Sequence, residues 1–255
     1  MISAGIDIGS RTIKVVLLEN NNIIFSKVID NSFNPIETCR SVLNGHPYNT
    51  ITSTGYGRHL FADYFQSEVI SEIKAFSIGI HHVLPNARTI LDIGGQDTKA
   101  IAIDENGAVR KFEMNDKCAA GTGRFLEIMA MALRFSLDEF GYQALSTNES
   151  VNINSMCAVF AESEIISMLA KGEDRSKIAR GIYFSVIKKS MAILKRVGLQ
   201  KEIAFAGGGA KSIALKTLME EVYQQPVFVP ENPQIMGALG CALYSQSKLL
   251  ANNPR

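Results

Sequence analysis

Two short segments of the chain repeat one arrangement of an acidic residue, glycine, threonine and lysine. The first runs from Asp7 to Lys14 (DIGSRTIK) and the second from Asp92 to Lys99 (DIGGQDTK). Each follows an apolar stretch typical of a buried strand and leads into a second strand that carries the threonine and the lysine. Glycine at a turn lets backbone N–H groups approach phosphate oxygens, and a carboxylate beside it is suited to face Mg²⁺. The two copies therefore predict a pair of hairpins that hold a polyphosphate from two sides.

A single acidic residue before glycine is weak evidence, because such residues often only cap turns at strand ends. Two copies, each between a buried strand and a hairpin, favour nucleotide binding over turn capping. A third glycine cluster, Gly207 to Gly209, follows a predicted strand at 202–205 and opens a helix with Lys211, as a nucleotide-binding turn would. Neither hairpin matches the GxxxxGK[ST] pattern of a P-loop.

Two of the four cysteines stand immediately before predicted helices. Cys118 lies in the segment 115–124 (NDKCAAGTGR), and Cys157 lies in the segment 154–164 (NSMCAVFAESE). The positive end of a helix dipole lowers the pKa of a thiol and stabilises an anionic centre. Two thiolates are half of the four ligands that an iron–sulfur cluster usually takes, and a two-fold homodimer would supply the other two. The simpler alternative stays open, because an isolated cysteine is usually a small buried hydrophobe.

Other residues near these segments have two interpretations each. Cys39 and Cys241 lie in apolar helical sequence and are predicted to pack in the core. Glu162, one turn into the helix after the second cysteine segment, is either an exposed residue or one that reaches the nucleotide. On the last predicted helix, Gly237 and Gly240 form a small-residue patch that permits close crossing of another helix, as a hinge between lobes or as ordinary packing.

The order of predicted elements is that of a mixed α/β protein. Each half begins with three strands, of which the second and third lie at 12–19 and 23–29, and again at 98–104 and 108–114. The predicted helices span 35–43, 58–64, 72–83, 121–135, 158–171, 176–197, 210–223 and 234–249. We place the first lobe at 1–86 plus 234–255 and the second at 87–233.

Composition excludes several classes of function. The charge is nearly balanced, with 26 basic and 25 acidic residues among 255, so wholesale binding to nucleic acid or to a membrane surface is not expected. No apolar run reaches the length of about 18 residues that a membrane span needs. The first residues lack the basic stretch and apolar core of a signal peptide, whose cleavage would destroy the first motif, so we expect a cytoplasmic protein.

Together these residues resemble the superfamily of acetate and sugar kinases, heat-shock chaperones and actin. They are most similar to the activators of 2-hydroxyacyl-CoA dehydratases, whose relatives include the ATPase subunits of benzoyl-CoA reductases. The segments that carry the resemblance are 7–14, 54–58, 92–99, 115–124, 157–164, 206–211 and 230–240. The resemblance implies a two-lobed actin-like (ribonuclease-H-like) ATPase fold, with duplicated mixed β-sheet lobes and a crossing helix as hinge.

The same resemblance implies a function. An activator of this type is an ATP-dependent electron donor of very low potential for a 2-hydroxyacyl-CoA dehydratase or a related iron–sulfur reductase, and a ferredoxin or flavodoxin reduces it. One 4Fe–4S cluster would bridge two identical subunits, with Cys118 and Cys157 of each as ligands. General kinases of the superfamily lack the two cysteine segments, which makes this resemblance specific.

Site residues follow from the resemblance position by position. Asp7 and Asp92 would organise Mg²⁺ and water around the β- and γ-phosphates of ATP, and either Gln96 or Asp97 would position the attacking water. The residues expected around the phosphates are Gly9, Ser10, Arg11, Thr12, Lys14, Gly94 and Gly95. Those expected elsewhere on the nucleotide are Glu162 and, nearer the adenosine, Gly207, Gly208, Gly209 and Lys211.

One segment departs from the family pattern. After residues 71–73 the family often continues with a Cys/Thr-His pair and a later Arg-Gly-Ala, whereas this chain has Lys74-Ala-Phe76 and then Ile78-Gly-Ile80. Phe76 neither titrates nor donates a hydrogen bond as histidine does. Two rival functions stay open: a small-molecule kinase of the same superfamily without a metal cluster, and a nucleotide-gated scaffold in which the cysteines only pack.

Overall fold

The computed structural model describes residues 1–116, 120–154 and 157–252, so that Cys118, one of the predicted cluster ligands, lies outside the described residues. The chain separates into two compact units. Unit 1 comprises Met1–Arg88, Ile103–Arg110 and Pro230–Arg255. Unit 2 comprises Thr89–Ala102 and Lys111–Val229. The lobe boundaries predicted at 86 and 234 remain predictions.

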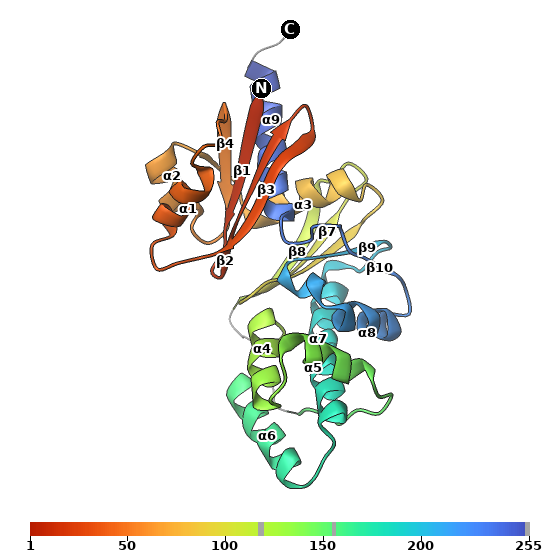
Figure 1. Cartoon of the computed structure of the whole chain (residues 1–255). Coiled ribbons are helices and arrows are strands. Elements are labelled where there is room, and N and C mark those ends of the chain that lie inside the picture. The colour runs from red at the N-terminus through yellow and green to blue at the C-terminus, as the bar shows by residue number, and fades with distance from the viewer. Residues whose placement is uncertain (117–119, 155–156, 253–255) are drawn as a thin grey trace. The chain divides into compact units, whose positions relative to one another are not determined.

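Unit 1 contains a five-stranded mixed sheet (Figure 1). Its strands are β1 (Ile2–Ile8), β2 (Thr12–Glu19), β3 (Asn22–Asp30), β4 (Thr50–Thr54) and β5 (Glu68–Val69). The order across the sheet is β3-β2-β1-β4-β5. The first three strands are antiparallel, and β4 and β5 are added in parallel. The predicted hairpin at the end of β1 is therefore part of the centre of this sheet.

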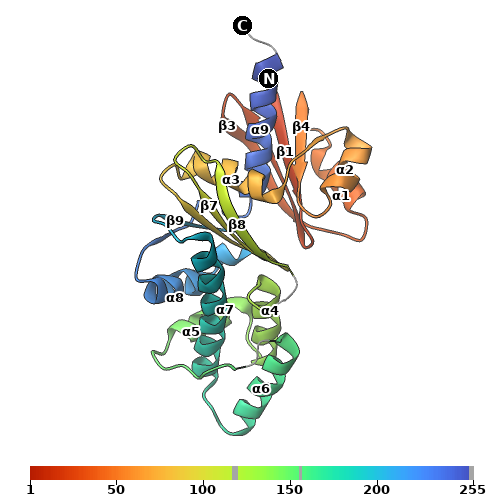
Figure 2. The same ribbon diagram turned by 180° about the vertical axis from the view of Figure 1, so that it is seen from behind.

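Helices cover both faces of this sheet. They are α1 (Pro35–Leu43), α2 (Arg58–Phe65), α3 (Glu72–Val83) and α9 (Met236–Asn252). Because side chains alternate along a strand, Ile6 packs in the core with residues of α1 and α2. The adjacent Gly5 lies against α9, where a Cβ would lie 2.0 Å from the carbonyl oxygen of Ala238. Figure 2 shows α9 running along this sheet. A Cβ on Gly240 would lie 1.8 Å from the carbonyl oxygen of Ala75, so α9 crosses α3 as closely as the small-residue patch predicted. A role of this crossing as a hinge remains a prediction.

The second sheet repeats the topology of the first. Its strands are β6 (Thr89–Ile93), β7 (Thr98–Ile103), β8 (Val109–Asn115), β9 (Ile203–Ala206) and β10 (Val227–Phe228). The order is β10-β9-β6-β7-β8, with β6 antiparallel to β7 and parallel to β9. Thus β6 takes the place of β1, β7 that of β2, and β9 that of β4. The predicted α/β fold with duplicated mixed sheets is confirmed.

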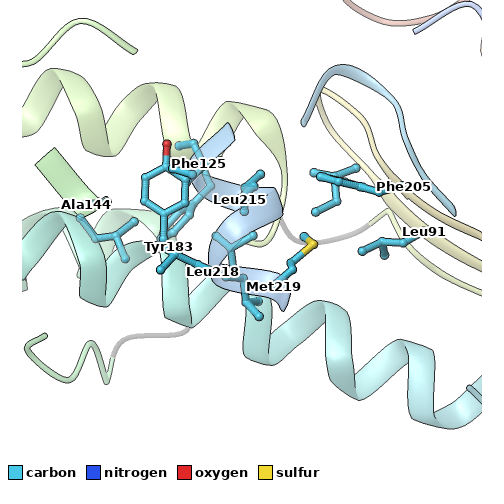
Figure 3. Close-up of a cluster of buried hydrophobic side chains, with 14 of the residues drawn as sticks. Leu91, Phe125, Ala144, Tyr183, Phe205, Leu215, Leu218 and Met219 are labelled. Carbon is cyan, nitrogen blue, oxygen red and sulfur yellow. The ribbon is translucent and has the colours of Figure 1, made fainter. Parts of the chain in front are cut away.

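Unit 2 carries a larger helical layer on its sheet. The helices are α4 (Gly123–Ala132), α5 (Leu137–Leu145), α6 (Ala158–Ala170), α7 (Arg175–Val197), the short 3₁₀ helix η1 (Gly208–Lys211) and α8 (Ile213–Tyr223). Figure 3 shows how Leu218 and Met219 of α8 lie between the sheet and Tyr183 of α7. Leu91 and Phe205 contribute to this core from the sheet. The core fixes the ends of β6 and β9, where the glycine motifs begin.

Two helix predictions differ from the structure. The helix predicted at 121–135 ends at Ala132, because Arg134 adopts a left-handed conformation with φ of +55°. The following helix α5 was not predicted, although Ser136 and Glu139 form the capping box at its start, with Ser136 N donating to Glu139 Oε2 at 2.8 Å. Within the described ranges, no helix has both the length and the apolar character needed to cross a membrane.

Candidate active site

The turn between β1 and β2, which we call hairpin 1 (residues 7–14), places a buried ion pair beside an exposed tip. Asp7 and Lys14 are directly opposite in the strand register, and Lys14 Nζ lies 3.2 Å from Asp7 Oδ2. Gly9 N donates to the carbonyl oxygen of Thr12 at 3.1 Å, which closes the turn. Arg11 is exposed at the tip, as is the serine before it. The hairpin therefore presents a cation and backbone groups to solvent above an acid that is 4% exposed.

The turn between β6 and β7, which we call hairpin 2 (residues 92–99), has the same backbone with one more acidic residue. Lys99 Nζ lies 3.2 Å from Asp92 Oδ2 and 2.6 Å from Asp97 Oδ2. Gly94 N donates to the carbonyl oxygen of Asp97 at 2.9 Å, as Gly9 does to Thr12. The Gln96 side chain is exposed and has no hydrogen-bond partner among the described residues. Gln96 and Asp97, the two candidates for positioning the attacking water, thus differ in their contacts: Asp97 forms an ion pair with Lys99, whereas the Gln96 side chain faces solvent.

A glycine loop lies against the acidic residue of each hairpin. Gly207, after β9, has φ of +80°, and a Cβ there would lie 2.1 Å from Asp92 Oδ1. Gly55, after β4, has φ of +89°, and a Cβ there would lie 2.5 Å from Asp7 Oδ1. Both the left-handed conformation and the close approach require glycine. The structure therefore adds Gly55 to the candidate site residues; in the sequence it was marked only as part of segment 54–58, which carries the family resemblance.

The third glycine cluster contains three further predicted site residues, Gly208, Gly209 and Lys211. Gly209 is buried beside Ile93 of β6, where a Cβ would lie 2.8 Å from the Ile93 Cβ. Gly208 and Lys211 are exposed. The predicted positions of these residues near the adenosine are not tested by the packing and stay predictions.

The connection after the third strand holds the tip of hairpin 1 from the side. In unit 1 this connection runs from β3 to α1, and its first residue, Asn31, makes two hydrogen bonds to the tip. Asn31 N donates to the carbonyl oxygen of Arg11, and Asn31 Nδ2 donates to that of Gly9, both at 2.8 Å. The tip is fixed by backbone and side chain together.

The equivalent connection in unit 2 runs from β8 to α4 and contains the predicted ligand Cys118. Here the first turn of α4 holds the tip of hairpin 2. Gly123 N donates to the carbonyl oxygen of Gly94 at 2.9 Å, and Arg124 N donates to that of Gly95 at 3.0 Å. The start of α4, which belongs to the predicted cysteine segment 115–124, is therefore hydrogen-bonded to hairpin 2.

The second predicted ligand, Cys157, is the N-cap residue of α6 and is exposed. Asn154 is fastened to this helix, because its N and Nδ2 both donate to Glu164 Oε1, at 3.0 and 3.2 Å. Immediately after Cys157, Val159 and Phe160 have exposed fractions of 67% and 68%. A thiol at a helix N-terminus, beside an exposed apolar surface, can serve as a ligand at a contact with another protein.

The other two described cysteines are unsuited to such a role. Burial raises the pKa of the Cys39 thiol to about 12. Burial, and then the charge of Asp7, raise the pKa of the Cys241 thiol well above its usual value. The prediction that both pack in the core is confirmed. No group of three metal-binding side chains occurs within 1–116, 120–154 and 157–252.

Two further residues that the sequence singled out have clear positions. Glu162 is exposed on α6, and its predicted contact with the nucleotide stays a prediction. Phe76 is 4% exposed on α3, and a Cβ on Gly237 would lie 3.2 Å from its ring. The residue that departs from the family pattern is thus part of the packing between α3 and α9.

Comparisons with known proteins agree with these features. Residues 4–245 match the BadF/BadG/BcrA/BcrD ATPase family. The activator of lactoyl-CoA dehydratase from Anaerotignum propionicum is 40% identical over 254 residues, which cover 96% of this chain and 97% of that protein. The 2-hydroxyisocaproyl-CoA dehydratase activator of Clostridioides difficile is 37% identical, covering 96% and 95%.

Solved structures give the same result. The Clostridium difficile activator of 2-hydroxyisocaproyl-CoA dehydratase with bound ADPNP superposes with a TM-score of 0.89 at 36% identity, over 99% of this chain and 97% of that one. Component A of (R)-2-hydroxyglutaryl-CoA dehydratase from Acidaminococcus fermentans has a TM-score of 0.90 at 35% identity, over 97% and 98%. A glucokinase of the ROK family from Streptomyces griseus, at 11% identity and a TM-score of 0.63, shares the fold alone, over 97% of this chain and 100% of that one.

Proposed function

The chain belongs to the BadF/BadG/BcrA/BcrD ATPase family, and from that premise we propose that it is the ATP-dependent electron donor of an enzyme of the 2-hydroxyacyl-CoA dehydratase class. The family and the actin-like fold make it an ATPase. Relatives at 36–40% identity over nearly the whole chain are named activators of such dehydratases. In this function a ferredoxin or flavodoxin reduces the protein, which passes one electron to its partner.

For ATP hydrolysis we assign Mg²⁺ to the acids at the ends of β1 and β6. Asp7 and Asp92 are buried carboxylates at glycine turns, which is the donor chemistry that this hard cation prefers. Bound Mg²⁺ would supply charge stabilisation at the phosphates. The attacking water is assigned to Gln96 rather than Asp97, because Asp97 is held by Lys99 while Gln96 is exposed. Arg11 and Lys14 supply positive charge toward the phosphates.

For electron transfer we assign Cys157, together with Cys118 outside the described residues, as ligands of a 4Fe–4S cluster. The observation that carries this assignment is the contrast among the cysteines. Cys157 is an exposed thiol at the N-terminus of a 13-residue helix, whereas Cys39 and Cys241 are buried thiols with raised pKa values. The donor set therefore fits the group, which when bound supplies one-electron transfer at low potential.

A cluster with four thiolate ligands implies a homodimer, because each chain offers two. The exposed surface of α6 supports this step. Val159, Phe160 and Ile166 on this helix have exposed fractions of 56% or more, and large apolar side chains exposed on one element are typical of contact sites. We therefore place the subunit contact at the start of α6, around Cys157.

The alternative of a small-molecule kinase has weaker support. The kinases that resemble this chain share about a tenth of its residues, and that likeness extends to the fold alone. A kinase would also leave unexplained an exposed thiol beside exposed apolar residues.

Anaerobic purification followed by iron and sulfide analysis tests the proposal. We expect a brown protein with about four iron atoms per dimer. Cys157→Ala should lose the iron and weaken the dimer, measured by analytical ultracentrifugation. Cys241→Ala is the matched control, since it removes a buried thiol and should retain the iron. A colourless wild-type protein, or unchanged iron in Cys157→Ala, would contradict the assignment.

A further inference from the structure

The segment that follows Cys118 is tied to hairpin 2 by three hydrogen bonds. Thr98 Oγ1 donates to the carbonyl oxygen of Gly121 at 2.8 Å. The other two bonds run from the amides at the start of α4 to the carbonyl oxygens of Gly94 and Gly95, at 2.9 and 3.0 Å. Thr98 is 3% exposed and Gly121 is buried, so water does not compete for the first of these bonds.

The same segment is packed on its other side by α7. A Cβ on Gly121 would lie 3.6 Å from Lys189 Cδ, and Lys189 Nζ lies 5.4 Å from the centre of the Phe125 ring. A Cβ on Gly123 would lie 3.2 Å from the carbonyl oxygen of Gly94. Residues 120–122 are buried, and the segment contacts both the hairpin tip and α7. A displacement of the tip is therefore transmitted to it, because close-packed groups do not compress.

The peptide planes at the tip connect this contact to phosphate. The carbonyl group of Gly94 and the N–H of Gly95 belong to one planar trans peptide and point in opposite directions. The Gly94 carbonyl accepts from α4, whereas the N–H groups of Gly95 and Gln96 have no acceptor among the described residues. A rotation that directs the Gly95 N–H toward a phosphate oxygen must also move the oxygen that holds α4. The residues on both sides of this peptide, Gly94 and Gly95, are glycines, which permit such rotation.

We infer that residues 120–124 relay the nucleotide state of hairpin 2 to the segment that carries Cys118, and that Thr98 is the positioning residue that keeps this segment in register with the hairpin. This inference rests on the proposed function, because it assumes that hairpin 2 contacts phosphate and that Cys118 is a ligand. The proposed connection runs through the backbone at the start of α4.

Thr98→Val tests the relay, because it removes the hydroxyl and keeps the shape of the side chain. Thr89→Val is the matched control. Thr89 is also a buried threonine of the same sheet, and its Oγ1 donates to the carbonyl oxygen of Gln200 at 2.9 Å, away from the segment. Thr98→Ser, which keeps the hydroxyl, should behave as the wild type.

The first readout is hydrogen exchange of peptides covering 120–126 in protein without the cluster. With a non-hydrolysable ATP analogue and with ADP, the wild type should exchange at rates that differ several-fold. Thr98→Val should raise exchange in the nucleotide-free protein about 5-fold, the effect of one hydrogen bond. It should also bring the rates with the two nucleotides together. Nucleotide-independent exchange in the wild type, or an unchanged nucleotide effect in Thr98→Val, would overturn the inference.

The second readout is the rate at which a chelator removes iron from the reduced, cluster-loaded dimer. The ratio of rates with the two nucleotides should fall toward one in Thr98→Val and stay at its wild-type value in Thr89→Val. If the ratio of iron-removal rates is the same in all variants and iron is present, the inferred relay is wrong and the proposed function still stands. Absence of iron in the wild type, with nucleotide-dependent exchange at 120–126, would remove the cluster assignment and leave the relay between hairpin and segment.

Discussion

Hairpin 1 and hairpin 2 have the same backbone and opposite charge. Both close with a hydrogen bond from glycine N to the residue three positions on, and both hold a lysine 3.2 Å from the acid at the end of the central strand. Residues 7–14 contain one acidic and two basic side chains and carry a net charge of +1. Residues 92–99 contain two acidic side chains and one basic and carry −1. Duplication has kept the geometry, while substitutions at the tip have reversed the charge.

This difference supports a division of roles between the two hairpins in the proposed binding of ATP. Phosphate oxygens are anions and favour the hairpin with surplus positive charge, which has Arg11 at its tip. Mg²⁺ favours the hairpin with the surplus carboxylate, where Asp92 and Asp97 share Lys99. We therefore expect hairpin 1 to contribute mainly to nucleotide binding and hairpin 2 mainly to metal positioning and hydrolysis.

The supports of the two hairpins differ as well. In unit 1 the chain passes from β3 to α1 through four residues, and the side chain of Asn31 holds the tip. In unit 2 the passage from β8 to α4 is longer, contains Cys118, and holds the tip through backbone amides. The cysteine segment thus occupies the connection that in the other unit serves only as a support.

The largest difference should appear in stability when each lysine is removed. Lys99→Met leaves Asp92 and Asp97 together without their shared cation, so we expect a loss of about 3–5 kcal/mol in the free energy of unfolding. Lys14→Met leaves one acid, Asp7, without its cation, and the Lys14 side chain is more exposed than that of Lys99. This change should lower the free energy of unfolding by on the order of 1–3 kcal/mol. Urea unfolding followed by circular dichroism measures both. Equal losses would show that the second acid of hairpin 2 has no energetic role.

The next effect concerns the metal. Asp92→Asn and Asp7→Asn should each lower the hydrolysis rate about 100-fold or more, because metal positioning is most valuable in the transition state. Asp92→Asn should raise the Mg²⁺ concentration required for half-maximal rate more than Asp7→Asn does, because hairpin 2 has the surplus carboxylate. Steady-state assays over a range of Mg²⁺ distinguish the two. A raised requirement in Asp7→Asn alone would reverse the proposed division of roles.

Much of this comparison was accessible from the sequence, because it depends on local patterns. An apolar stretch followed by an acid and glycine predicted both hairpins, and the helix predicted at 35–43 is observed as α1. The predicted bounds of α1 and α3 agree with the structure. Hydrophobic periodicity and helix-capping residues depend on a few neighbouring positions, so a single sequence is enough to predict the elements that they define.

What the sequence missed depends on distant pairing. Gly55 and Gly207 became equivalent only when β4 paired with β1 and β9 paired with β6. β9 lies about a hundred residues after β6, with the helices α4, α5, α6 and α7 between them, and no local pattern specifies that register. The end of α4 was missed because Arg134 adopts a conformation that favours glycine. Burial and distant contacts decide such positions, and local propensity does not.

A smaller effect separates the two hairpin tips. Gln96→Ala should lower kcat on the order of 10-fold with little change in KM, because it misplaces the attacking water without removing a charge. Arg11 occupies the same turn position in hairpin 1, and Arg11→Ala should raise KM for ATP and leave kcat nearly unchanged. Added salt should weaken the wild-type advantage over Arg11→Ala, since exposed charges are screened. A lower kcat in Arg11→Ala, with KM unchanged, would argue against the division.

The smallest expected effect concerns the support of hairpin 1. Asn31→Ala removes the hydrogen bond from Nδ2 to the Gly9 carbonyl oxygen, 2.8 Å long. It also removes a buried side-chain oxygen, Asn31 Oδ1, that has no partner among the described residues, which offsets part of the loss. We expect unfolding to become easier by about 1 kcal/mol. KM for ATP should rise about 5-fold, because a looser tip must be ordered again when phosphate binds.

Asn34→Ala is the control that separates these two consequences. Asn34 is the N-cap residue of α1 in the same connection, and its side chain accepts from Glu37 N at 3.3 Å. Its removal should also cost about 1 kcal/mol of stability, yet it makes no bond to the hairpin, so KM should stay unchanged. Equal KM values in both variants would mean that the tip of hairpin 1 needs no side-chain support. In that case the difference between the two connections would reflect the cysteine segment alone.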